Sequence, residues 1–272
     1  MKKKLLILCS VMFCLILFGK TDVSAKSAKP KWLQTGKTYT YDLDKDGAKE
    51  KLLYNFTGSG YNKQLTINGK KVFSTKSQYA EIAVADMDQS DKQMEIFIAS
   101  GKGLEDIFSS VNLNYYTFKN GKFAKVQDIK SVIKQKYSSV KYISVAGEET
   151  AYFPVKNGKL SVGVNLNLKN GLGIKSIYDT VVFKKGKFVT STNKSFSIEE
   201  YGTKYKCKGT NKVYKSPGSK KVAFKLKNKE KFSVIGFYWK NKNTYYIKVK
   251  NSKGKKGYVK NGTFKTYAKA YF

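Results

Sequence analysis

The chain has 272 residues and a formal net charge of +34, from 53 basic and 19 acidic side chains. Every basic residue is a lysine, and histidine is absent. The missing imidazole excludes Ser-His-Asp and Cys-His catalysis and every zinc site that uses histidine. The excess charge predicts an anionic partner or an anionic habitat, the alternative being a lysine-biased composition with solvated surfaces. Because lysine lacks the bidentate fork of arginine, we expect diffuse attraction to polyanions and no specific nucleic-acid recognition.

The N-terminal residues have the features of a secretory signal peptide. Met1–Lys4 is positively charged, residues 5–18 form an apolar run, and Val23-Ser24-Ala25 offers small side chains at a cleavage site. The apolar run is too short to predict a transmembrane helix. We therefore expect residues 1–25 to be removed and no stable membrane insertion afterwards.

Residues 26–37 follow as a basic lead. Cys207 is then the one cysteine left, so an intrachain disulfide cannot form. An exported chain with no disulfide, no histidine and lysine as its base predicts the surface or the medium of a Gram-positive bacterium. We expect a secreted, extracellular protein that associates with the cell wall.

The first predicted strand, 38–41, enters a short acidic segment, and the strand 51–56 leaves it. Three carboxylates alternate with other residues ahead of Gly47, which matches the first half of an EF-hand loop. The second half does not match, because Leu53 stands where the last ligand should fall. Alternation places the oxygens on one side of a tight loop, where Ca²⁺ could bind. The candidate metal ligands are Asp42, Asp44, Asp46 and Glu50.

A second acidic segment, between the predicted strands 80–85 and 95–99, repeats the pattern after one inserted residue. Its candidate metal ligands are Asp86, Asp88, Asp91 and Glu95. The alternative for both segments is an ordinary turn in which Asp side chains accept hydrogen bonds from backbone amides. Lys45, Lys49 and Lys92 lie close by and weaken both candidate sites.

Hairpins follow each acidic segment. Asn-Gly is the strongest short signal for a two-residue hairpin turn, and Lys-Gly stands once in a similar place. The predicted turns are Asn68-Gly69, Asn120-Gly121, Asn157-Gly158 and Lys185-Gly186. A third unit, roughly 140–189, keeps the hairpins without the acids. Apolar residues at helical spacing predict one short helix over 128–136.

The spacing of the units, 44 residues from Asp42 to Asp86, lies within the range of a propeller blade. Three units cannot close a propeller, which typically needs at least about four blades. For residues 36–195 the sequence therefore predicts an all-β body of hairpins and blade-like sheets, arranged as a partial propeller or as a sandwich.

The C-terminal part is predicted to be a small barrel. Residues 190–206 are polar and indicate a linker, and five short strand-like pieces follow within 205–264, ahead of a tail at 265–272. Aromatic side chains there could stack on sugar rings or could form the core of the barrel. The candidate ligand-binding residues are Tyr238, Trp239, Tyr245, Tyr246 and Tyr258, the first two expected at a turn.

Residues 212–260 resemble bacterial SH3-like (SH3b) domains of the extracellular type. The resemblance rests on Ser216-Pro217-Gly218 after the Val213 strand, and on Tyr246-Ile247-Lys248-Val249 ahead of the Gly257-Tyr258-Val259 strand. The sequence departs from the family at its opening, Asn211–Tyr214 in place of Asn-Val-Arg, and in the Asn228-Lys229 turn, which lacks the usual glycine. It departs again at two late positions, where tyrosines replace tryptophans. The resemblance implies a small SH3-like barrel that binds cell-wall polymers.

The acidic segments are similar to the loops of FG-GAP and VCBS-type repeats of secreted bacterial proteins, and the whole arrangement resembles secreted proteins of clostridial-type bacteria. In those repeats the loop carboxylates hold calcium. The resemblance therefore implies calcium as a cofactor.

Together these features predict an exported, non-catalytic protein that binds peptidoglycan, teichoic acid or another anionic extracellular polymer. The alternative is a cell-wall hydrolase or accessory protein that its SH3-like domain anchors. A glycosidase needs two carboxylates facing each other across a cleft. By contrast, Glu105-Asp106, Glu148-Glu149 and Glu199-Glu200 are adjacent pairs that point to opposite faces of an extended chain. A Ser–Lys pair stays open, since the chain is rich in both residues, but no motif supports one.

Overall fold

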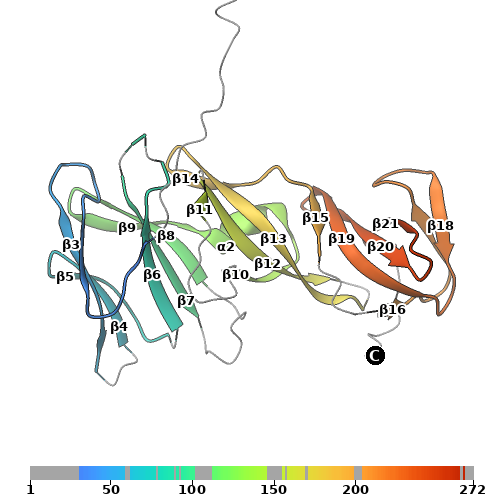
Figure 1. The fold of residues 1–272 in the computed structure, drawn as a ribbon, viewed down its shortest axis with the longest axis horizontal. Coiled ribbons are helices and arrows are strands. Elements are labelled where there is room, and N and C mark those ends of the chain that lie inside the picture. The colour runs from blue at the N-terminus through green and yellow to red at the C-terminus, as the bar shows by residue number, and fades with distance from the viewer. Residues whose placement is uncertain are drawn as a thin grey trace, which may run out of the picture.

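The computed structural model describes residues 31–58, 62–77, 79–88, 90–91, 93–101, 112–145, 155–156, 158–168, 171–198, 204–263 and 266. Antiparallel strands dominate these residues, with one short helix, α2 (Ile129–Lys136), so the predicted all-β class is confirmed. Figure 1 shows an elongated body whose sheets succeed one another from the N-terminal to the C-terminal end. No helix among the described residues is long and apolar enough to span a membrane.

Several sequence predictions fall outside the described residues. They are the signal peptide at 1–25, the acid pairs Glu105-Asp106, Glu148-Glu149 and Glu199-Glu200, and the tail 265–272 apart from Thr266.

Each of the three predicted units forms one antiparallel meander. The first sheet contains β2 (Thr38–Tyr41), β3 (Glu50–Thr57), β4 (Asn62–Ile67) and β5 (Lys70–Thr75). The second sheet contains β6 (Tyr79–Ala85), β7 (Glu95–Gly101), β8 (Asn112–Lys119) and β9 (Lys122–Asp128), with β1 (Lys31–Trp32) beside β6. The third sheet contains β10 (Val140–Val145), β12 (Lys159–Leu168), β13 (Gly173–Lys184) and β14 (Lys187–Thr190), with β11 (Val155–Lys156) beside β12.

The second sheet is the middle layer of the N-terminal body. Side chains that alternate along β6 and β7 enter two different cores. One core, shared with the first sheet, receives Ile82, Val84, Ile96 and Ile98, and the other, shared with α2 and the third sheet, receives Ala83, Ala85, Phe97 and Ala99. Because both faces are covered, these two strands are apolar almost throughout.

The predicted hairpin turns have the backbone that a type I′ turn requires, with φ positive at both central residues. Asn68 and Gly69 have φ of 51° and 77°, and Asn120 and Gly121 have 50° and 70°. Lys185-Gly186 repeats the geometry between β13 and β14. Asn157 lies outside the described residues.

Helix α2 begins where the sequence predicts it. The carboxylate of Asp128 caps the first turn by accepting a hydrogen bond from the amide of Lys130 at 2.9 Å. Ile129, Val132 and Ile133 form its buried face, which packs against the second and third sheets.

The C-terminal residues form a fourth sheet in the order β15-β19-β20-β21-β17-β18, with β16 also on β19. Its strands are β15 (Ser195–Ser197), β16 (Lys204–Lys206), β17 (Asn211–Tyr214), β18 (Val222–Leu226), β19 (Lys231–Asn241), β20 (Thr244–Asn251) and β21 (Lys256–Lys260). Within the part of the chain described, no pairing joins the two outer sides of this sheet. The strands predicted for a barrel therefore form an open sheet.

Two segments expected to be connections belong to sheets instead. In the predicted linker, 190–206, both β15 and β16 pair with β19, because Phe196 and Tyr205 are buried. In the basic lead, 26–37, Lys31 and Trp32 pair with β6. The third and fourth sheets also share one hydrophobic core, so the C-terminal sheet is joined to the body by packing.

Candidate functional site

The first acidic loop connects β2 to β3 and is folded by its own carboxylates. Asp42 accepts hydrogen bonds from the backbone amides of Lys45, at 2.7 Å, and Gly47, at 3.1 Å. Both residues have positive φ, 68° and 88°, and the glycine adopts this conformation without steric cost. The alternating acids thus shape the loop in the way that Asp-rich turns do.

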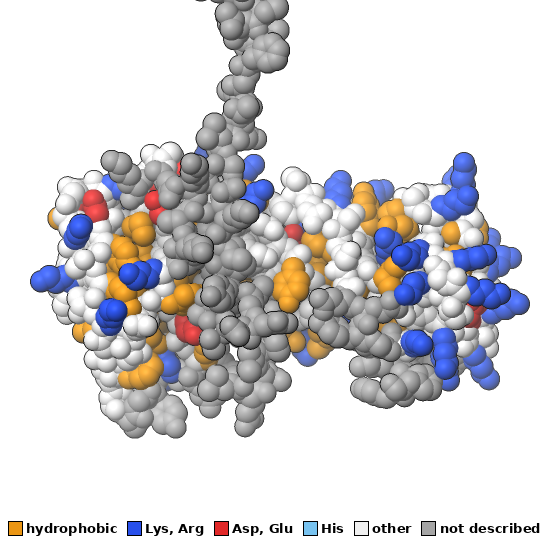
Figure 2. Space-filling model, in the orientation of Figure 1, with side chains coloured by type: hydrophobic (Ala, Val, Ile, Leu, Met, Phe, Trp, Pro, Cys, Tyr) orange, Lys and Arg blue, Asp and Glu red, His pale blue; other side chains and the backbone are white. Residues whose placement is uncertain are grey.

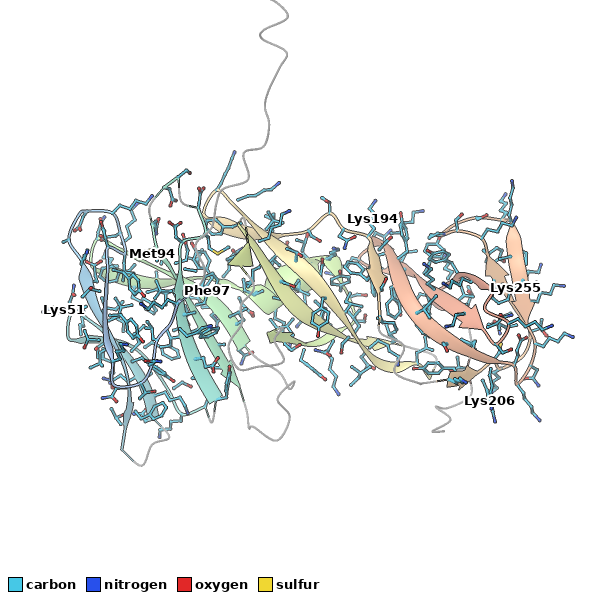
Figure 3. The ribbon with its side chains drawn as sticks, in the orientation of Figure 1. Lys51, Met94, Phe97, Lys194, Lys206 and Lys255 are labelled. Carbon is cyan, nitrogen blue, oxygen red and sulfur yellow. The ribbon has the colours of Figure 1, made fainter. Side chains whose placement is uncertain are left out.

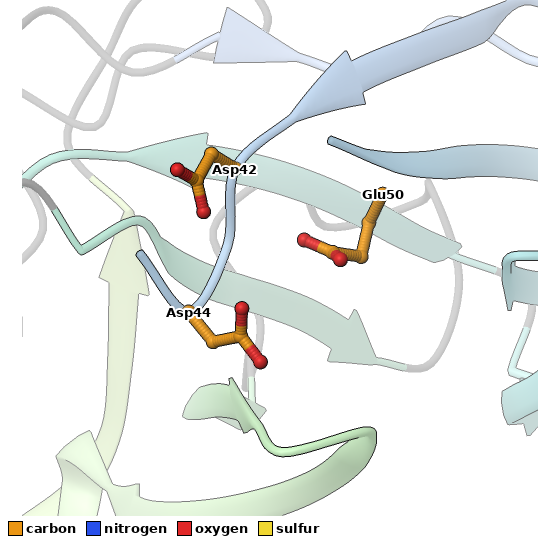
Figure 4. Close-up of side chains that lie close together, drawn as sticks. All are labelled: Asp42, Asp44 and Glu50. Atoms are coloured by element: carbon orange, nitrogen blue, oxygen red, sulfur yellow. The ribbon is translucent and has the colours of Figure 1, made fainter. Parts of the chain in front are cut away.

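Three of the four predicted ligands in this loop come together. One carboxylate oxygen each from Asp42, Asp44 and Glu50 lies within 4.8 Å of the others (Figure 4). Glu50 is buried, and its Oε2 accepts a hydrogen bond from the amide of Leu43 at 2.8 Å. The exposed carboxylate of Asp46 lies outside the group and accepts a hydrogen bond from the amide of Ala48 at 2.7 Å.

The oxygens of Asp44 indicate what the group can hold. Asp44 Oδ2 accepts a hydrogen bond from the amide of Asn120, in the turn between β8 and β9, at 2.9 Å. Asp44 Oδ1 is buried and has no hydrogen-bond partner among the described residues. An orphaned carboxylate oxygen beside two further carboxylates fits a hard cation such as Ca²⁺, which takes oxygen ligands.

The second acidic loop, between β6 and β7, repeats one feature of the first. Glu95 stands at the start of β7, as Glu50 does at the start of β3, and its Oε2 accepts a hydrogen bond from the amide of Met87 at 2.8 Å. Only 1% of Glu95 is exposed, and this burial raises the pKa of its carboxyl to about 8. Burial also raises the pKa of Asp86. The sequence pairing of the two loops therefore corresponds to a shared geometry at Glu50 and Glu95.

The remaining acids of the second loop are used differently. Asp88 Oδ1 accepts a hydrogen bond from the hydroxyl of Ser90 at 2.6 Å. Asp91 Oδ1 accepts the amide of Gln93 at 3.0 Å and forms a 3.2 Å ion pair with Lys45 of the first loop. Among the described residues, these acids do not form a group as tight as the one in the first loop. The ammonium of Lys45, from the first loop, therefore supplies positive charge beside Asp91.

The aromatic candidates in the fourth sheet divide by strand alternation. Trp239 and Tyr245 are only 2% and 3% exposed, and their rings stack with centroids 4.6 Å apart. Trp239 also meets Tyr137 of the body edge to face at 4.8 Å. These two belong to the core. The expectation of a turn at Tyr238 and Trp239 is wrong, because β19 continues to Asn241, whose side chain accepts the amides of the following turn.

The other three candidates lie on the outer face of the same sheet. Tyr238 and Tyr246 are directly paired, with ring centroids 6.3 Å apart. Tyr258 is half-buried on the next strand, and the ammonium of Lys248 lies 5.9 Å from the centre of its ring. This half-buried row of tyrosines and lysine is the outer tyrosine face.

One polar cluster has no signal in the sequence. Asp179 on β13 is 2% exposed and accepts hydrogen bonds from Lys136 Nζ at 2.8 Å, Tyr137 Oη at 2.7 Å and Ser191 Oγ at 2.7 Å. Lys136 also donates to Ser191 Oγ at 2.9 Å. The hydroxyl proton of Ser191 is committed to a carboxylate, so the cluster is a cross-link between α2 and the third sheet.

Charge is distributed unevenly along the molecule. Residues 204–263 contain 19 lysines and one acid, Glu230, whereas residues 31–101 contain ten lysines and nine acids. Most of the lysines in 204–263 are exposed. Figure 2 shows them over the C-terminal end of the body, and Figure 3 places Lys206 and Lys255 there.

No protein-family model, curated protein or solved structure matches this chain.

Proposed function

We propose that this protein is exported and attaches, without catalysis, to the bacterial cell wall or to another anionic extracellular polymer through its lysine-rich fourth sheet. The observation that carries the proposal is the charge of residues 204–263, with 19 lysines against one acid on an open sheet. Teichoic polymers are rich in phosphate, and such a surface suits them.

The strength of this attachment comes from the number of lysine–anion contacts. A single exposed lysine–anion pair contributes at most about 1 kcal/mol, and salt screens it over a Debye length of about 8 Å at physiological ionic strength. Many lysines on one sheet act together on a polymer that offers many phosphates, and such multivalent contacts add to a firm attachment.

The outer tyrosine face supplies a second kind of contact in this proposal. Tyr238, Tyr246 and Tyr258 present half-buried rings beside lysines, so a glycan strand could rest its apolar ring faces on them while the lysines meet its anionic groups.

We further propose that the first acidic loop holds Ca²⁺ through Asp42, Asp44 and Glu50. The fit rests on the close carboxylates and on the orphaned Asp44 Oδ1. The chemistry that the ion would supply is charge neutralisation, which would stabilise the end of the first and second sheets where the two loops meet.

Sedimentation with purified Gram-positive cell walls tests the attachment. We expect the bound fraction to fall steeply from low to high salt, and to fall again on walls stripped of teichoic acid. Binding that salt leaves unchanged, but that Tyr238→Ala abolishes, would assign recognition to the tyrosine face instead. Release of soluble muropeptides above background would favour a hydrolase over a binding protein.

A further inference from the structure

The fourth sheet contains a cavity of about 260 Å³ at one end of β19 and β20. This volume lies just below the range of about 300–1,000 Å³ typical of sites for drug-sized ligands. Three lysines, two serines, Asn251 and Phe232 line the cavity, and no described lining residue is acidic. A cavity of this size and charge suits a small anionic group.

Strand register explains how three lysines reach one cavity. Lys204 on β16 pairs with Ser233 on β19, and Ser233 pairs with Lys250 on β20. Directly opposed residues of an antiparallel sheet share a face, with Cβ atoms about 4.5–5.5 Å apart. Lys231 lies two residues before Ser233 and therefore points to that face as well. A row of lysine, serine and lysine crosses three strands, with a third lysine beside it.

Two buried polar side chains complete the lining. Ser233 is 6% exposed and Asn251 is 7% exposed. The side-chain oxygen of Asn251 accepts the amides of Lys253, at 3.1 Å, and Lys255, at 2.9 Å, so what this side chain can offer a ligand is its NH₂ group. The hydroxyl of Ser233 can donate one hydrogen bond. The polar groups that line the cavity are therefore suited to donate to an acceptor-rich group.

We infer that this cavity binds a phosphate group, as a phosphomonoester or phosphodiester. Lysine ammoniums act on phosphate as point charges with rotatable donors, and the hydroxyl and amide add directional hydrogen bonds. The inference deepens the proposed function and rests on it for the source of the phosphate, which we take to be the wall polymer. The cavity's own binding can be measured without any cell wall.

Isothermal titration of the full chain with inorganic phosphate and with glycerol phosphate tests the inference. We expect saturable binding at one site, weakened at least tenfold in Lys204→Gln/Lys250→Gln, since each of these lysines would donate a charge-assisted hydrogen bond to the phosphate. Lys70→Gln/Lys71→Gln, on β5 of the first sheet, removes the same charge outside the fourth sheet and should weaken binding less than twofold. Equal losses in the two variants, or no saturable binding, would overturn the inference.

Ser233→Ala keeps the charge and changes only the row's central hydroxyl, so it tests the cavity even if a lysine variant fails to fold. We expect a several-fold weaker affinity, and an unchanged affinity would count against the site. Poly(glycerol phosphate) and phosphatidylglycerol vesicles identify the source. Tighter binding of the polymer identifies the wall as the source of the phosphate, and tighter binding of the vesicles identifies a lipid headgroup as the source.

Wall sedimentation of the same variants separates the two proposals. If walls bind in a salt-dependent manner but inorganic phosphate does not bind, the cavity inference fails and the proposed function stands. If phosphate binds in the cavity but walls do not sediment the protein, the cavity inference stands and the proposed function fails.

Discussion

The buried cluster around Asp179 should be among the most sensitive points of the structure. Replacing Asp179 with alanine removes the acceptor for one ammonium and two hydroxyls, all at 2.7–2.8 Å. The side chain of Lys136 is only 11% exposed, so its charge would stay buried without this counterion. Removing one partner of a buried ion pair costs about 3–5 kcal/mol. Since domains are stable by about 5–15 kcal/mol, we expect the variant to lose a large share of its stability.

Urea denaturation followed by circular dichroism measures this loss as a lower midpoint with an unchanged slope. The matched control is Lys136→Met/Asp179→Leu, which removes both charges. Replacing a buried ion pair by apolar side chains is often nearly neutral, so the double variant should be more stable than Asp179→Ala, although the hydroxyls of Tyr137 and Ser191 still lose their acceptor. A loss below about 1 kcal/mol in Asp179→Ala, or a double variant as unstable as the single one, would refute the reasoning.

Three further predictions follow from the loops and the core. Calcium at a hundred-fold excess over Kd should stabilise the protein by about 2.7 kcal/mol. Thermal melting should show this shift in the wild type and in Asp46→Ala but not in Asp44→Ala, and a shift that survives in Asp44→Ala would place any ion elsewhere. Burial raises the pKa of Glu95 from 4.5 to about 8, so in a chelator the free energy of unfolding should fall as the pH rises between these values, and Glu95→Gln should remove this fall. Urea midpoints of the wild type and of Glu95→Gln at pH 5 and pH 9 measure this fall. Equal pH dependence in the two proteins would contradict the prediction. Trp239→Ala should lower the free energy of unfolding by about 3–5 kcal/mol because it empties a core position, whereas Tyr238→Ala on the outer face should lower it much less. Similar urea midpoints for the two variants would show that the two faces are not distinct.

Local sequence signals determined much of the fold. Asn68-Gly69 and Asn120-Gly121 predict hairpin turns because both central residues must adopt positive φ, and both do. The helix over 128–136 follows from the spacing of its apolar residues, which is a local property. The meander of each unit then follows, because short turns can only join neighbouring antiparallel strands.

Contacts between residues far apart in the chain could not be predicted from the sequence. Lys45 forms an ion pair with Asp91, 46 residues later in the chain. Nothing in either segment indicates that their loops lie side by side. The sequence predicts Trp239 at a turn after a strand ending near Phe237, but β19 continues through a bulge between Val234 and Gly236 as far as Asn241. Polar residues at 190–206 suggested a linker, although Phe196 and Tyr205 are enough to hold two short strands.

The uneven distribution of charge gives the molecule an electric dipole along its length. Its lysine-rich end and its nearly neutral, acid-bearing end lie at opposite ends of an elongated body (Figures 1 and 2). In the field of an anionic matrix such a body experiences a torque as well as an attraction, so it turns before any side chain makes contact. The shared core between the third and fourth sheets transmits that turn to the whole molecule. An attached molecule would therefore stand with its first and second sheets directed away from the matrix.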